Sequence, residues 1–218
     1  MLDTIDLSVS FSPHAQQAIT WLQAQRVAGW VVGGTVRDAL LRRPSHDLDL
    51  AVPRDALPLA KRLADALGAA FFPLDAARDV GRAVLAEPDG SQTYVDVAAL
   101  RGPTLADDLR LRDFTLNALA LDIQAPAAGV IDVTGGLQDL QQRVLRVASS
   151  YSFRDDPLRL LRGVRLALAF DLTWDAFSLE LARRHAAALD QVAAERVRED
   201  LNRAFVLSRA DLALRQLD

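Results

Sequence analysis

The chain has 218 residues, of which half are hydrophobic and 25% are charged, and its formal net charge is −4. It contains no cysteine, which excludes a disulfide framework and a thiolate metal site within it. No apolar run reaches the roughly 20 residues that span a bilayer, and the acidic N-terminus is unlike a signal peptide. We therefore expect a cytoplasmic protein with no membrane partner. The negative charge also argues against a domain that grips RNA over its whole surface.

The first 100 residues alternate between the periodicities of helices and strands, with glycines marking where elements end. In chain order we expect a helix from Pro13 to near Gly29, a strand over 30–32, a helix over 35–42, a strand over 48–52, a helix over 56–67 ended by Gly68, and strands over 69–100.

The second half of the chain changes in composition. A helix and then a strand are expected after Asp113, and another strand over 129–133. From about Asp155 onward the chain is rich in Ala, Leu, Arg and Glu, which predicts helix throughout. We expect an α+β fold in which a mixed sheet with helices (residues 1–148) is followed by an all-helical domain (residues 149–218).

A glycine pair, Gly33 and Gly34, follows a predicted strand and precedes a predicted helix. Such glycines let the backbone approach a ligand closely, and N–H groups at the helix start favour anions. Arg37, one turn later, adds a cation suited to phosphate oxygens. The segment is neither a P-loop nor a Rossmann fingerprint. A plain surface turn remains the alternative for this segment taken alone.

Three aspartates on two predicted strands form the second candidate site. Asp47 and Asp49 are two residues apart, so their side chains face the same side of a strand. Paired carboxylates favour a cation between them, and Mg²⁺ prefers oxygen ligands. Asp96 is a lone acid in the apolar strand Tyr94–Val97. If the two strands are neighbours, three carboxylates can serve metal-assisted phosphoryl transfer; otherwise they are solvated acids.

A row of arginines marks the start of the helical region. Arg159, Arg162 and Arg165 recur every third residue and lie along one side of a predicted helix, with Asp156 one turn earlier. Residues 142–165 contain six arginines and two aspartates, within a chain that is acidic overall. The pattern indicates either an anion-binding surface or a solvated helix face.

Together, five segments resemble in order the motifs of class II tRNA CCA-adding enzymes and bacterial poly(A) polymerases. These segments are Gly33–Asp38 followed by Asp47-x-Asp49, Arg112–Ala118, Ile131–Leu140, Asp155–Arg159 extended by Arg162 and Arg165, and Glu195–Glu199. The resemblance implies a metal-dependent nucleotidyltransferase head and a helical neck. Members of that family continue into helical body and tail domains that hold the RNA.

The resemblance also implies residue roles. Asp47 and Asp49 would bind Mg²⁺, and Asp96 would lie near the attacking 3′-hydroxyl. Asp156 and Arg159 would read the base, since an aspartate accepts from the amine of cytosine or adenine and an arginine donates to the ring nitrogen. The implied nucleotide-binding set is Gly33, Gly34, Arg37, Arg112, Asp113, Asn117, Asp156, Arg159, Arg162 and Arg165.

Three positions depart from the family pattern: Leu111 replaces an arginine, Asp155 a glutamate and Arg42 a glycine. None of them removes an implied metal ligand. The expected activity is template-independent transfer of CMP and AMP from CTP and ATP to the 3′ end of tRNA. The alternatives are an ATP-only enzyme (a poly(A) polymerase or a terminal-A-adding enzyme) and a nucleotide-binding fragment without turnover. The nucleotide is expected in a cleft between the two domains.

Overall fold

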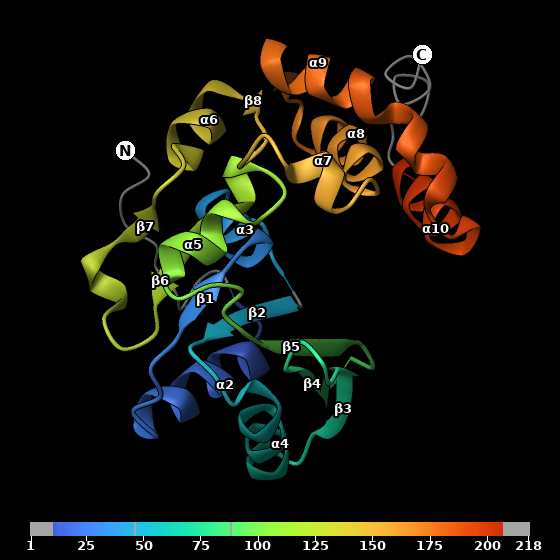
Figure 1. The fold of residues 1–218 in the computed structure, drawn as a ribbon. Helices are drawn as coiled ribbons and strands as arrows, with labels where there is room; N and C mark the ends of the chain where they lie inside the picture. The colour runs from blue at the N-terminus through green and yellow to red at the C-terminus, as the bar shows by residue number, and fades with distance from the viewer. Residues whose placement is uncertain (1–10, 46, 88, 207–218) are drawn as a thin grey trace. The chain divides into compact units, whose positions relative to one another are not determined.

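The computed structural model describes residues 11–45, 47–87 and 89–206, which fall into two compact units (Figure 1). Unit 1 comprises Met1–Leu109 and Leu119–Val133, and unit 2 comprises Arg110–Ala118 and Thr134–Asp218. Residues 110–118 and 134–148 thus group with unit 2, and the division at residue 148 stays a proposal about functional domains. None of the described helices is long and apolar enough to cross a membrane.

Unit 1 is built on a mixed sheet, which confirms the predicted α+β class. Its described strands have the order β3-β4-β5-β2-β1-β6-β7. Strands β2 and β5 run parallel, and the other neighbours are antiparallel. The strands are β1 (Trp30–Val32), β2 (Asp47–Val52), β3 (Ala70–Asp75), β4 (Val80–Ala86), β5 (Gln92–Ala99), β6 (Leu119–Asp122) and β7 (Val130–Asp132).

Helices cover one face of the β2–β5–β4 part of this sheet. Burial alternates along β4 and β5, as expected for strands with one covered face. A Cβ atom at Gly81 would lie 2.9 Å from the Cβ atom of Ala60, so α4 packs on the Gly81 side. Arg82, next in the chain, therefore points to the opposite face. The described helices that lie wholly or mostly in unit 1 are α2 (Pro13–Ala24), α3 (Gly34–Leu40), α4 (Ala56–Leu67), the short α5 (Leu105–Arg110) and η2 (Pro126–Ala128).

The predicted helix ends are confirmed for α4 and wrong for α2. Gly68 ends α4 in the left-handed conformation, with φ of 64°. Helix α2, expected to reach Gly29, ends at Ala24. Arg26 adopts a left-handed φ of 52°, and the Val27 N–H bonds back to Leu22, which closes the helix early.

A polar cluster ties the start of α2 to the β4–β5 hairpin. Glu87 accepts a hydrogen bond from the Thr93 hydroxyl and lies 2.7 Å from His14 Nδ1. The Ser12 and Thr93 hydroxyls are 2.8 Å apart. The hydrogen bond from Thr93, helped by His14 and Ser12, lowers the pKa of Glu87 although burial opposes the shift. This carboxylate is therefore held in its charged form.

We expect this cluster to make unit 1 sensitive to acid. Because the folded pKa of Glu87 is lowered, its contribution to stability is full above its unfolded pKa and is lost as the pH falls through the folded pKa. Urea denaturation at about pH 7 and about pH 4 should give a smaller acid-induced loss of unfolding free energy in Glu87→Gln than in the parent chain. Glu180→Gln, at an exposed ion pair, should behave like the parent. Equal losses in Glu87→Gln and the parent would contradict the role of this cluster.

Unit 2 is mainly helical, and one detail of the prediction is wrong. Thr173–Trp174 form a strand, β9, paired in parallel with β8 (Val144–Leu145), where only helix was expected. Asp171 ends the preceding helix with a left-handed φ of 53° and turns the chain toward β8. The other elements among the described residues of unit 2 are η1 (Thr115–Asn117), α6 (Gly136–Gln142), α7 (Ser152–Asp155), α8 (Arg159–Phe170), α9 (Ala176–His185), η3 (Ala186–Gln191) and α10 (Ala194–Phe205).

An aromatic cluster holds α8 against β9. Trp174 packs edge-on against Phe114, with ring centroids 5.9 Å apart, and also lies beside Phe153. Gly163 lies directly under these rings, because a Cβ atom there would clash with Trp174 and approach Phe114 to 2.8 Å. The glycine in the middle of a helix is thus explained by close packing, which outweighs its low helix propensity.

Candidate active site

The glycine pair lies where the sequence pattern predicts, between β1 and α3. Gly33 has a φ of 75°, a left-handed conformation that favours glycine, and its N–H donates to the carbonyl of Leu119. A Cβ atom at Gly34 would lie 3.2 Å from an Arg37 guanidinium nitrogen, so that side chain lies over the turn. Arg37 is largely buried and donates to both carboxylate oxygens of Asp38, at 3.0 and 2.9 Å.

Sheet pairing brings the three predicted carboxylates onto one face of unit 1. In the parallel β2–β5 pair, Asp49 lies directly opposite Asp96, and Asp47 lies opposite Tyr94. Residues in register on neighbouring strands share a face, as do Asp47 and Asp49 along β2. The condition that the two strands be neighbours is therefore met.

Thr35 fixes the backbone of this acidic strand. Its hydroxyl donates to the carbonyl of Asp47 at 3.3 Å and accepts from the N–H of Asp49 at 3.0 Å. Because Thr35 belongs to α3, the start of that helix is tied to the segment that carries both acids. Sequence patterns did not indicate this contact.

Asp96 has an arginine partner that the sequence reading missed. Arg82 Nε and Nη2 donate to the two oxygens of Asp96 at 2.6 and 2.7 Å, and the guanidinium lies 4.8 Å from the Tyr94 ring centroid. The hydrogen bond to Asp96 raises the pKa of Arg82 against an opposing desolvation effect, and the charges of Asp96 and Asp47 add to this. A hairpin centred on residue 89 pairs positions 82 and 96, and this symmetry was the available signal.

These residues fit a magnesium ion by the chemistry of their donors. Among the described residues, no three Asp, Glu, His or Cys side chains are gathered into a metal site. Asp96 is held by Arg82, whereas Asp47 and Asp49 present carboxylates from one face of β2. Mg²⁺ commonly takes one or two protein carboxylates and completes its shell with water and substrate phosphates. Two aspartates are therefore a sufficient protein contribution.

In unit 2, two predicted motifs meet around a buried carboxylate. Asp113 accepts hydrogen bonds from the Phe114 N–H (2.8 Å), the Asn117 amide (3.1 Å) and Arg162 Nη1 (3.1 Å). Burial alone would raise the pKa of Asp113, but the Arg162 charge and these hydrogen bonds lower it. The pKa of Arg162 is raised, since its pairing with Asp113 outweighs its own desolvation. Asp113 thus holds Asn117 and Arg162 in place.

Arg159 is drawn into the interior of unit 2. Its Nη1 and Nη2 groups donate to the carbonyls of Arg112 at 3.3 Å and Leu111 at 3.0 Å. Nη1 also lies 3.2 Å from the Ser152 hydroxyl. The side chain therefore joins the segment that precedes Asp113 to the helix that carries the arginine row.

Arg165 and Asp156 contact residues of α10. Arg165 lies 3.4 Å from Asp200, and Asp156 accepts from the Leu158 N–H and lies 3.7 Å from Arg196. The row is thus not a solvated helix face, because its members have acidic or carbonyl partners. Of the α10 partners, only Arg196 lay in a segment that the sequence pattern had singled out, Glu195–Glu199.

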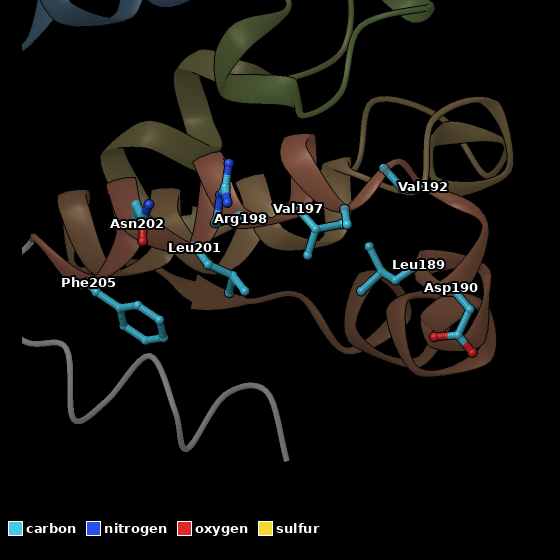
Figure 2. Close-up of a pocket in the computed structure, with 9 residues that line it drawn as sticks. Leu189, Asp190, Val192, Val197, Arg198, Leu201, Asn202 and Phe205 are labelled. Carbon is cyan, nitrogen blue, oxygen red and sulfur yellow. The ribbon is translucent and has the colours of Figure 1, made fainter.

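A separate apolar pocket of about 430 Å³ lies between η3 and α10 in unit 2 (Figure 2). Val197, Leu201 and Phe205 recur every fourth residue along α10 and line it together with Leu189 and Val192. None of the predicted nucleotide-binding residues lines this pocket. It is therefore distinct from the arginine and aspartate network described above.

Comparison with known proteins gives consistent matches. Residues 29–146 match the poly A polymerase head domain. The CC-adding tRNA nucleotidyltransferase of Geobacter sulfurreducens is 44% identical over 181 residues, which are 83% of this chain and 41% of that protein. The enzyme of the same name from Synechocystis sp. is 40% identical over 174 residues, 79% of this chain and 40% of that protein.

A solved structure is also similar. The Thermotoga maritima CCA-adding enzyme complexed with tRNA_CCA matches with a TM-score of 0.79 and 28% identity, over 93% of this chain and 49% of that chain. This chain spans half or less of the length of each of these proteins. The family model covers more than half of this chain and agrees with the ordered motifs. The chain therefore belongs to the poly(A) polymerase head-domain family, the family of class II tRNA CCA-adding enzymes and bacterial poly(A) polymerases.

Proposed function

We propose that this chain is the nucleotidyltransferase part of an enzyme that adds CMP and AMP, from CTP and ATP, to the 3′ end of tRNA with Mg²⁺. The observation that carries the proposal is the β2–β5 register, which sets Asp49 opposite Asp96 with Asp47 on the same face. This arrangement would supply two carboxylates for a metal and a third for the attacking hydroxyl.

In the proposed reaction the RNA 3′-hydroxyl attacks the α-phosphorus of the nucleoside triphosphate, and pyrophosphate leaves. Asp47 and Asp49 would hold Mg²⁺. When bound, the ion would neutralise phosphate charge and favour deprotonation of the hydroxyl. Asp96 would orient that hydroxyl by accepting its hydrogen bond, and Thr35 would keep the β2 backbone in place. Gly34 and Arg37 would contact the nucleotide phosphates.

Base selection is proposed for the network of unit 2. Asp156 would accept from the exocyclic amine of cytosine or adenine, and Arg159 would donate to the adjacent ring nitrogen. Guanine and uracil present the reverse pattern, so both protein groups would lose their partners. Arg162, held by Asp113, supports this pair or the phosphates, and Arg112 and Asn117 complete the proposed set.

Addition of CMP alone is a second candidate. Two relatives, 44% and 40% identical to this chain, are named CC-adding tRNA nucleotidyltransferases. The proposed Asp–Arg pair accepts both C and A, so it does not distinguish CC from CCA addition.

Incorporation of single labelled nucleotides tests these proposals. Each nucleoside triphosphate would be supplied with Mg²⁺ to tRNA ending before CCA, tRNA ending in CC, and an unrelated RNA. C followed by A on tRNA supports CCA addition, and C only supports CC addition. A only on CC-ending tRNA indicates a terminal-A adder, and A on every RNA a poly(A) polymerase. Binding of ATP or CTP without incorporation would overturn the proposal for this chain alone and leave a nucleotide-binding part.

We expect Arg159→Ala to reduce discrimination against GTP and UTP roughly 10- to 100-fold, because the partner of the ring nitrogen is lost. The same change leaves the carbonyls of Leu111 and Arg112 without this donor, which costs about 1–3 kcal/mol of stability. Ratios of kcat/KM for the four nucleotides would measure the first effect, and urea denaturation the second. Arg143→Ala, at an exposed ion pair in the same unit, is the control. Unchanged ratios in Arg159→Ala would refute the base-reading role.

A further inference from the structure

A row of side chains in register crosses the sheet of unit 1 at the proposed catalytic position. Phe72 on β3 pairs with Arg82 on β4, Arg82 with Asp96 on β5, and Asp96 with Asp49 on β2. Figure 1 shows these four strands in the order β3-β4-β5-β2. Only β5 separates the strand of Arg82, β4, from the acidic strand β2. Arg82 lies on the same face of the sheet as the carboxylates of Asp47 and Asp49.

Arg82 is fixed in this row from two sides. It makes a bidentate pair with Asp96, and its guanidinium lies 4.8 Å from the ring centroid of Tyr94. The pair is partly exposed, with 34% of the Arg82 side chain and 25% of the Asp96 side chain accessible. A guanidinium in this geometry sets the plane of the carboxylate, whereas an ammonium group does not.

The charge of Arg82 also bears on the metal. Three carboxylates on one face repel one another, and a cation beside them relieves that repulsion in the absence of a divalent ion. The same cation repels Mg²⁺ when the ion binds nearby. The pKa of Arg82 is raised mainly by its hydrogen bond to Asp96, and the charge of Asp47 adds to this shift.

We propose that Arg82 is a positioning residue for nucleotidyl transfer, which orients the Asp96 carboxylate and, as a resident counter-charge, weakens divalent-metal binding by the Asp47–Asp49 pair. This inference rests on the proposed function and adds to it a residue that acts through Asp96. Two separable effects follow. Loss of the charge should tighten metal binding, and loss of the bidentate geometry should slow transfer.

The test compares Arg82→Gln, Arg82→Lys and the control Arg62→Gln in the 218-residue chain. Arg62 belongs to α4, the helix that packs on the opposite face of the sheet, and its guanidinium lies over the ring of Trp21. Metal affinity would be measured with Mn²⁺ alone by electron paramagnetic resonance, and transfer by steady-state incorporation. Thermal melts would establish that each variant is folded.

Arg82→Gln should bind Mn²⁺ roughly 5-fold more tightly because a nearby positive charge is gone. Its kcat should fall roughly 30-fold, with the nucleotide KM little changed, because Asp96 is no longer oriented. Arg82→Lys should keep the parent Mn²⁺ affinity but show a similar fall in kcat, and Arg62→Gln should match the parent in both.

Several results would overturn the proposal. Weaker or unchanged Mn²⁺ binding in folded Arg82→Gln rules out the counter-charge role, because a purely structural arginine would not tighten binding when removed. Parent-like kcat in Arg82→Lys rules out the positioning role. If the parent chain itself incorporates no nucleotide, the proposed function fails, while the Mn²⁺ comparison still decides the counter-charge role. If Arg82→Gln does not fold, Arg82→Lys carries the positioning test and Arg82→Met, which also lacks the charge, carries the Mn²⁺ test.

Discussion

Asp49→Asn is expected to reduce nucleotide incorporation roughly 1,000-fold, which corresponds to about 4 kcal/mol of transition-state stabilisation. Asp49 is central among the three acids, in register with Asp96 and two residues from Asp47. Loss of its charge would remove half of the proposed protein contribution to the metal. Asp47→Asn should have an effect of similar size. The measurement is single-turnover incorporation of CTP into tRNA lacking CCA.

The fold should survive these substitutions. Asp47 is exposed and Asp49 partly exposed, and removal of one of several like charges relieves repulsion. Urea denaturation should therefore give an unfolding free energy equal to or above that of the parent. Asp65→Asn, at an exposed ion pair with Lys61 on α4, is the matched control and should retain full incorporation. A folded Asp49→Asn variant with parent-like incorporation would contradict the assignment of Asp49 as a metal ligand.

Asp113→Ala is expected to destabilise the protein by about 3–5 kcal/mol, the usual cost of removing one partner from a buried ion pair. Asp113 is buried and accepts from Arg162, Asn117 and its neighbour Phe114. The substitution would leave the partly buried Arg162 guanidinium without this carboxylate. Equilibrium urea denaturation of the 218-residue chain would measure the loss.

Glu180→Ala serves as the control for this prediction. Glu180 and Arg184 form an ion pair on α9 in which both side chains are more than half exposed, at 53% and 69%. Exposed pairs contribute about 0–1 kcal/mol, so this variant should remain close to the parent. A loss below about 1 kcal/mol in Asp113→Ala would show that the buried network is not a stability element of unit 2.

Several parts of the fold and site are predictable from the sequence because they depend on local periodicity. Spacing of two residues on a strand places Asp47 and Asp49 on one face, whatever the strand pairs with. Helix α4 and its glycine end follow in the same way from an amphipathic repeat and a residue that tolerates positive φ. The ordered motifs also predicted the family through their resemblance to its members, and the comparisons confirm that prediction.

Other features depend on contacts between segments distant in sequence, for which periodicity carries no signal. Strand β9 forms where Asp171 turns the chain toward β8, although the composition of the surrounding region favours helix. The early end of α2 depends likewise on a left-handed Arg26 that no local pattern marks.

The sequence by itself determined the identity and spacing of the acids, glycines and arginines, and it predicted the α+β class. It did so because residue identity and local periodicity are properties of the chain. The tertiary structure alone decided that β5 lies beside β2, so that Asp96 joins the acidic face, and that Arg82 holds Asp96. It also turned Arg159 toward backbone carbonyls of the Leu111 segment. The physical reason is that strand neighbours and buried charge partners are chosen by the packing of the whole domain, since a buried charge must find a partner wherever the fold brings one within reach.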